Sequence, residues 1–391
     1  MNIRSKLPTI AIWFFSIAFL FVGNMVATHG LNVFAEEEEL TVFSAVVTQI
    51  VERDDWRVEM GAGFYIENSL ITFNARITSG EARGQYVLAD HYLDGMLITP
   101  IKEVEVGDRI LIFYDPFLEL YTFIDYVRIN YIVILGLVFF ALMVLFGGRK
   151  GFNSIIALGF TCVAIFMVLV PAILSGRNIY ITTLVVCVYI IASTLLTVIG
   201  PGKKSVSAML GCLGGVLLAA LLMFIMDIIL NLTGVVDHDS QFLLALPVDP
   251  PLSLSAVVFA GVIIGAVGAI MDVAMSISSS LWEVNLAGGD MSFRAVFRAG
   301  LNIGKDILGT MLNTLILAYI GSALSLILLL TFYAQGTSLL ELFNREMIAV
   351  ELLRAIIGSF GIFLAVPLTS GICGLLYTQK PEAQTSYNSN W

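Results

Sequence analysis

Apolar runs close to 20 residues long recur along this chain of 391 residues and restrict it to one class of fold. A helix needs about 20 apolar residues to cross a hydrocarbon core about 30 Å thick. The composition agrees, because 58% of the residues are hydrophobic and only 13% are charged, whereas soluble domains carry about 25% charged residues. The sequence therefore predicts a polytopic, all-α membrane bundle with about eight spans.

Acidic residues are concentrated in one segment. Residues 36–122 contain 17 acidic and 6 basic side chains, and the rest of the chain contains 13 acidic and 14 basic ones. Short β-favouring runs in this segment are separated by Gly-containing turns, which predicts a small β-rich domain of five or six strands, a barrel or a sandwich. Strands are expected at Leu40–Val51, Ser69–Ile77, Gln85–Ala89 and Arg109–Tyr114. No basic face outside the short loops indicates binding to nucleic acid.

These features divide the chain into four parts. Residues 1–35 form a signal-anchor or a signal peptide, residues 36–122 an extracytoplasmic acidic domain resembling a β-barrel, residues 123–378 the polytopic membrane domain, and residues 379–391 a cytoplasmic tail. Val33-Phe34-Ala35 resembles a signal-peptidase site, but the apolar stretch before it is longer than in cleaved signals, which favours an uncleaved first span. With either alternative, residues 36–122 lie outside.

Seven further spans follow the acidic domain. They are expected at 128–146, 152–174, 179–199, 205–231, 252–281, 306–333 and 347–377. The short loops on one side carry pairs such as Arg149-Lys150 and Lys203-Lys204, so this side is predicted to be cytoplasmic. Both termini are then cytoplasmic if the first span is uncleaved. No internal repeat is visible.

Polar residues interrupt the sixth span in a regular pattern. Steps of three and four residues place one set on a single helix face: Gly261, Gly265, Gly268, Asp272, Ser276, Ser279 and Glu283. The glycines of this set would let a neighbouring backbone approach closely. Polar residues inside a membrane span mark a working site by default.

The seventh span carries a second polar face, formed by Asp306, Thr310 and Asn313, with Gly309 against it. From the rise of a helix, about 1.5 Å per residue, Asp272 and Asn313 are expected at similar depth near the membrane centre and facing each other. Glu283 and Asp306 would then lie near the cytoplasmic rim. Between the two spans, an amphipathic interfacial helix capped by Ser292 is expected, with a bend at Gly300 and Gly304.

The chemistry of these residues favours binding over catalysis. An ionised carboxylate at the depth of Asp272 costs a few kcal/mol unless it is protonated, paired or hydrated. Because only Arg354 is a cationic side chain at comparable depth, a proton or a hard cation is the expected partner. No catalytic motif is present, and the four cysteines lie in apolar helical runs. We therefore expect neither an enzyme nor a cofactor, and the identity of any metal stays open.

Several segments together resemble the YibE/F family of bacterial multi-pass membrane proteins. The matching segments are Gly261–Glu283, Gly300–Ser322, the GGRKG loop at Gly147–Gly151, Lys203–Gly215 and Gly358–Ser370. The resemblance covers about residues 125–378, although Lys305 stands where an Arg is expected. It implies location in the bacterial plasma membrane but supplies no mechanism.

Two functional hypotheses follow. The first is a transporter or channel-like protein for a proton, cation or small solute, with a polar site between the sixth and seventh spans. Asp272 would bind the cation or proton, Asn313, Thr310 and Ser276 would complete the polar shell, and Asp306 and Glu283 would form the mouth. The alternative is a non-transporting envelope scaffold or sensor, whose outer domain binds a protein or glycan. The lipid bilayer is a partner in both, and the oligomeric state is open.

Overall fold

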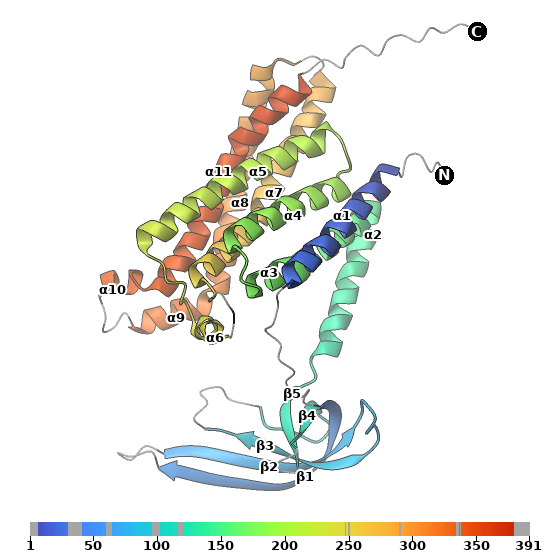
Figure 1. Ribbon diagram of the computed structural model, residues 1–391, viewed down its shortest axis with the longest axis vertical. Coiled ribbons are helices and arrows are strands. Elements are labelled where there is room, and N and C mark those ends of the chain that lie inside the picture. The colour runs from blue at the N-terminus through green and yellow to red at the C-terminus, as the bar shows by residue number, and fades with distance from the viewer. Residues whose placement is uncertain are drawn as a thin grey trace, which may run out of the picture. The chain divides into compact units, whose positions relative to one another are not determined.

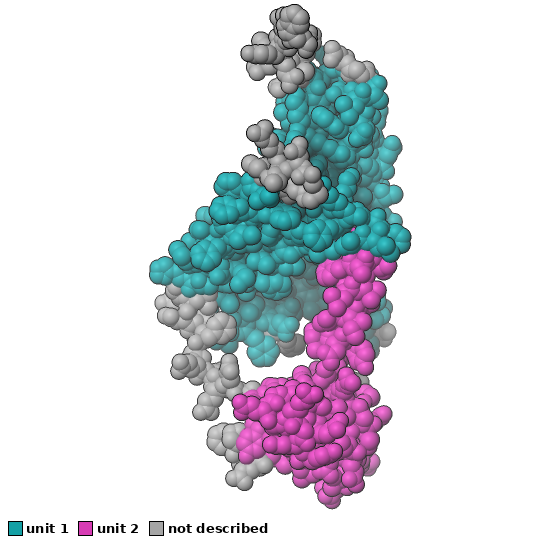
Figure 2. Space-filling model, turned by 90° about the vertical axis from the view of Figure 1, so that its right-hand side faces the viewer, with its two compact units in different colours: residues 1–33, 144–391 teal, residues 34–143 magenta. Residues whose placement is uncertain are grey.

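The computed structural model describes residues 7–29, 41–59, 65–95, 102–115, 120–246, 248, 251–288, 291–333, 336 and 338–378. The chain forms two compact units, one of residues 1–33 and 144–391 and the other of residues 34–143 (Figure 2). The Val33-Phe34-Ala35 motif and the tail 379–391 lie outside the described residues.

The acidic segment folds into a closed five-stranded barrel with the strand order β1-β2-β3-β5-β4. Its strands are β1 (Val42–Glu59), β2 (Tyr65–Ile77), β3 (Tyr86–Leu93), β4 (Arg109–Asp115) and β5 (Leu120–Tyr126). All neighbouring strands pair antiparallel except β3 and β5, which are parallel. The prediction of a small barrel is thus confirmed in its coarse form.

Alternation of apolar and polar residues explains how the barrel closes. Along β2, the buried residues Ile71, Phe73, Ala75 and Ile77 alternate with more exposed ones, as expected when one face of a strand is covered. The four expected strands were found, but β1 is longer than expected and β5 was not predicted. Since β5 continues to Tyr126, the barrel runs past residue 122, where the acidic domain was expected to end.

The remaining elements are helical (Figure 1). They are α1 (Leu7–Thr28), α2 (Ile129–Ala164), the π-helix η2 (Ile165–Leu169), α3 (Val170–Leu174), α4 (Ile179–Val198), α5 (Lys203–Leu230), α6 (His238–Leu244), α7 (Leu254–Gly288), α8 (Phe293–Ser322), α9 (Leu324–Tyr333), α10 (Leu339–Phe343) and α11 (Glu346–Tyr377). In the described part of the chain, 7 helical segments are long and apolar enough to cross a membrane. The number, length and composition of these helices are those of a multi-pass membrane protein.

One of these segments, 129–174, is too long for a single crossing. Its 46 residues would measure about 69 Å as a helix, against a hydrocarbon core of about 30 Å. The helix is broken at Gly148, whose backbone has φ 53° and ψ −131°, a conformation that favours glycine. Gly148 lies in the predicted loop Gly147–Gly151, so this segment accounts for two spans. The seven segments then match the eight spans expected.

Helix α11 contacts three other long helices of the helical unit, α5, α7 and α8 (Figure 1). Small residues allow these contacts. A Cβ atom built at Gly300 would lie 2.5 Å from the Oγ of Ser370, and one at Gly304 would overlap the side chain of Val366. The absence of side chains at Gly300 and Gly304 therefore lets α8 pack closely against α11.

The separate interfacial helix and the bend that were expected before the seventh span are not found. Ser292 does cap a helix, because its Oγ accepts a hydrogen bond from the Ala295 amide at 3.4 Å. That helix, however, is α8 itself, which continues without a break from Phe293 to Ser322. Gly300 and Gly304 do not bend it.

Helix α1 packs into the same unit. The ring of Phe19 stacks on that of Tyr189 in α4, with centroids 4.3 Å apart. Arg177 donates two hydrogen bonds to the carbonyl oxygen of Val26, at 3.1 and 2.7 Å. Helix α1 also contacts η2 and α3.

Candidate functional site

The polar stripe of α7 lies on the open side of that helix. Gly261, Gly265, Gly268 and Asp272 are exposed, although the other sides of α7 are buried, for example at Ile270. Ser276 and Ser279 are half-buried, and Glu283 is exposed again. The expected alignment on one helix face is therefore present, but most of the stripe is not covered by another described helix.

Asp272 lines a cavity of about 400 Å³ between α2, η2, α4 and α7. Three hydroxyl groups face the same cavity from two other helices: Ser154 and Thr161 on α2 and Thr194 on α4. Thr161 donates its hydroxyl hydrogen to the carbonyl of Ala157, so its oxygen remains free to accept or to coordinate. The wall is otherwise apolar.

The cavity wall contains a break in helical regularity. Ile165, the first residue of the π-helical turn, lines the cavity, and Val168 in the same turn meets α1. A π-helical turn shifts the register of the residues that follow it and occurs frequently at functional sites. Here it separates the cavity-lining residues of α2 from α3, which contacts α1.

No cationic side chain lines the cavity, and no described residue forms an ion pair with Asp272. The carboxylate is thus left for a proton, a cation or water. The described residues also contain no group of three or more His, Cys, Asp or Glu side chains that could hold a metal ion. The groups available to a cation at this point are one carboxylate and hydroxyl oxygens, which suit hard cations.

The structure does not join the α8 residues to Asp272. Asp306, Thr310 and Asn313 are exposed, and none of them lines the cavity. The Thr310 hydroxyl donates to the carbonyl of Ile307 in its own helix, at 2.9 Å. The expected pairing of Asp272 with Asn313 is therefore not seen among the described residues. Helical spacing predicts the depth of Asp272 and Asn313 in the membrane. Which side of α8 faces α7, however, depends on how α8 packs on α11.

The glycines differ in their surroundings. A Cβ built at Gly265 would lie 3.4 Å from the hydroxyl of Tyr319 in α8. At Gly261, Gly268 and Gly309 it would meet no described heavy atom within 4 Å. The close helix approach expected at these three positions is therefore not seen, unlike at Gly304.

Two buried polar clusters were not predicted from the sequence. The hydroxyl oxygens of Ser207, Ser278 and Tyr377 lie 2.8 Å from one another and join α5, α7 and α11. In the second cluster, Tyr180 donates to the buried carboxylate of Asp227 at 3.0 Å. Each cluster unites residues far apart in the sequence, so only the small polar residues inside apolar runs could have pointed to them.

Comparison with known proteins identifies one matching family. The family model described as YibE/F-like protein matches residues 135–379, which is more than half of the chain. No curated protein and no solved structure shows significant similarity. The chain therefore belongs to the YibE/F-like family of proteins.

Proposed function

We propose that this protein is a plasma-membrane transporter or channel-like protein for a proton, a cation or a small solute, with Asp272 at its centre. The observation that carries the proposal is an acidic side chain, exposed on α7, that lines a cavity between α2, η2, α4 and α7 and has no basic partner among the described residues. A carboxylate in a membrane span is costly unless it is functional or paired. A group that can gain and lose a proton or cation there is suited to carrying one across.

The surrounding residues have distinct roles in this proposal. Asp272 binds the ion, and the hydroxyl oxygens of Thr161 and Thr194 complete its shell from α2 and α4. Ser276 continues the polar face of α7 by one turn. Glu283 lies two further turns along the same helix face and forms part of the cytoplasmic mouth, with both termini on the cytoplasmic side.

The exposed polar face of α8 adds a second part to the route. Asp306, Thr310 and Asn313 follow one another along the exposed side of the helix, and in this proposal they line a water-accessible part of the route. The π-helical turn at Ile165 supplies a place where α2 can change register as the cavity opens and closes.

Flux measurements in proteoliposomes test this proposal. Purified protein is reconstituted, and proton, Na⁺ and K⁺ gradients are followed with indicator dyes. Asp272→Asn keeps the size of the side chain but removes its charge, and it is expected to reduce flux to that of protein-free liposomes. Asp239→Asn, at an exposed position on α6, is the matched control and is expected to leave flux unchanged.

The envelope scaffold is the alternative, and one observation favours it: the barrel has a hydrophobic core of its own, which includes Phe73 and Ile112. A strain lacking residues 36–122 distinguishes the two proposals. If flux through the membrane unit survives this deletion, the scaffold proposal fails. If flux is absent from the wild type as well, the transporter proposal fails.

A further inference from the structure

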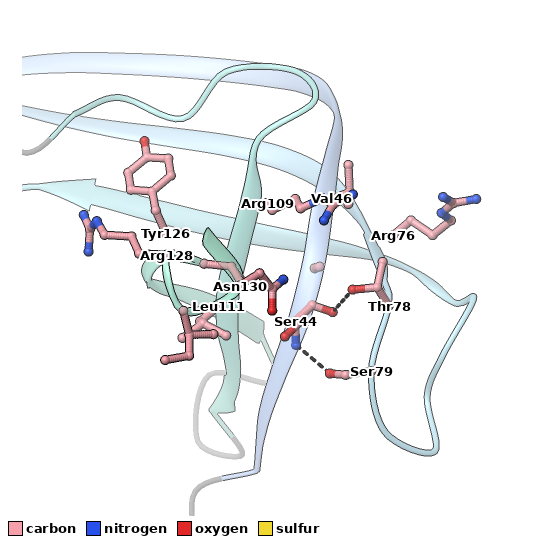
Figure 3. A pocket seen from close by; sticks show the side chains of 13 residues that line it. Ser44, Val46, Arg76, Thr78, Ser79, Arg109, Leu111, Tyr126, Arg128 and Asn130 are labelled. Atoms are coloured by element: carbon pink, nitrogen blue, oxygen red, sulfur yellow. Dashed lines mark hydrogen bonds between the residues drawn. The ribbon is translucent and has the colours of Figure 1, made fainter. Parts of the chain in front are cut away.

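A hollow of about 610 Å³ lies on the outside of the β-barrel and is built entirely within residues 34–143 (Figure 3). Its walls come from β1, β2, β4, the end of β5 and the start of α2. We propose that this hollow binds a phosphate group, carried by the headgroup of an anionic phospholipid. The proposal is independent of transport through the helical unit.

The charge of the hollow is opposite in sign to that of the acidic segment around it. The acidic segment, residues 36–122, has 17 acidic and 6 basic side chains. Yet the lining of the hollow includes three arginines, Arg76, Arg109 and Arg128, and no acidic residue. A concentration of positive charge on an otherwise acidic domain selects anions locally while the rest of the surface repels them.

Strand register explains why two of the arginines meet here. Val46 in β1 pairs with Arg76 in β2 on one side and with Arg109 in β4 on the other. Paired residues share a face of the sheet, and the neighbours of Val46, Ala45 and Val47, are buried in the barrel. Arg76, Val46 and Arg109 therefore form one row on the outer face, with the arginine Cα atoms about 10 Å apart across two strand spacings.

The two arginines of this row differ from two other arginines of the barrel in their partners. No ion pair of Arg76 or Arg109 occurs among the described residues, although Arg53 and Arg57 of the same barrel each pair with an acid. Arg128 pairs with Asp125 at 2.6 Å. Two guanidinium groups thus remain to bind an anion, and guanidinium matches the geometry of phosphate oxygens.

Neutral polar groups complete the lining. Figure 3 shows Ser44, Arg109 and Asn130 in the middle of the hollow, with Arg76 at one side and Arg128 at the other. Thr78 donates its hydroxyl hydrogen to the carbonyl of Ser44 at 3.0 Å. The amide of Asn130 has no hydrogen bond within the described residues, so it can donate to a ligand.

The position of the hollow in the chain indicates the source of the phosphate. Ile129 and Asn130 line it, and they are the first residues of α2, whose apolar run enters the membrane. The hollow therefore lies where the chain passes from water into lipid, the level at which headgroup phosphates are found. The unsatisfied amides of a helix N-terminus add favourable donors there.

The arginines also predict which lipid binds. Phosphatidylglycerol presents a phosphate with no positive group, whereas the choline of phosphatidylcholine would bring a cation towards Arg76 and Arg109. The volume of the hollow falls within the range of small-molecule sites, about 300 to 1,000 Å³. We expect the site to prefer phosphatidylglycerol.

Native mass spectrometry of the full-length protein tests the proposal. The protein is purified in detergent and titrated with phosphatidylglycerol, phosphatidylcholine or inorganic phosphate. The double variant Arg76→Gln/Arg109→Gln is expected to bind phosphatidylglycerol at least about tenfold more weakly, because it loses the charge-assisted hydrogen bonds from two guanidinium groups to the phosphate. Arg83→Gln, on a turn outside the hollow, is the matched control and should bind like the wild type.

A second variant distinguishes lost binding from lost folding. Arg76→Lys/Arg109→Lys keeps both charges and is expected to retain most of the binding, while Arg76→Gln/Arg109→Gln loses it at an unchanged thermal midpoint. Equal binding of phosphatidylglycerol by the wild type and the Gln double variant would overturn the proposal. Equal binding of the two lipids, or arginine-dependent binding of inorganic phosphate alone, would overturn the assignment to an anionic lipid.

Discussion

His91 in β3 should make the stability of the barrel depend on pH. Its side chain is 2% exposed, and neither ring nitrogen has a hydrogen-bond partner within the described residues. The ring packs against Phe123 with centroids 4.0 Å apart. Burial in these apolar surroundings lowers the pKa of His91 to about 4, against an ordinary value of 6.5, although the charge of Glu103 acts in the opposite direction.

The sign and size of the effect follow from proton linkage. Between pH 6.5 and pH 4 the unfolded barrel binds a proton at His91 that the folded barrel does not, so stability falls as the pH falls through this window. The loss attributable to His91 is about 2 kcal/mol between pH 7 and pH 5 and about 3 kcal/mol by pH 4.

Urea unfolding of the detergent-solubilised chain measures this effect. Trp56, which lies 5.9 Å from Tyr92 between ring centroids, reports on the barrel once Trp13, Trp282 and Trp391 are replaced by Phe. His91→Phe removes the titrating group and keeps an aromatic ring, so its stability should change less over the same pH range, by about 2 kcal/mol at pH 5. If both proteins lose stability equally between pH 7 and pH 5, the burial argument is wrong.

Two further predictions concern the helical unit. Gly304→Leu should destabilise it by about 1 to 3 kcal/mol or prevent folding, because the new side chain would overlap Val366 in α11. Gly309→Leu is the control, since a Cβ at that position meets no described atom within 4 Å. Equal thermal midpoints of the two variants would contradict the close packing of α8 on α11. Ser278→Ala removes the hydrogen bonds to Ser207 and Tyr377 and should lower the free energy of unfolding by about 1 to 2 kcal/mol, measured by titration with a denaturing detergent. An unchanged unfolding midpoint would show that the hydroxyl cluster does not stabilise the bundle.

Local patterns in the sequence predicted local structure well. Alternation along residues 69–77 identified β2, and the GGRKG loop at Gly147–Gly151 marked the break that divides α2 at Gly148. Strand β5 was missed because its apolar residues run almost directly into the apolar start of α2, so no change of pattern separates strand from span.

Features that depend on how helices rotate against one another could not be predicted. Spacing placed Asp272 and Asn313 at a common depth, but it could not tell which side of α8 turns towards α7. That choice is made by Gly300 and Gly304, whose missing side chains allow α8 to lie close to α11. The cavity beside Asp272 depends in addition on the π-helical turn at Ile165, and no residue type identifies such a turn.

Ion flux through proteoliposomes that contain Asp272→Asn tests the central proposal most directly. We predict that flux of the transported proton or cation falls to the level of protein-free liposomes in this variant. Asp239→Asn should retain wild-type flux, and both variants should keep the wild-type thermal midpoint. Wild-type flux in Asp272→Asn would contradict the assignment of the cavity between α2, α4 and α7 as the transport site.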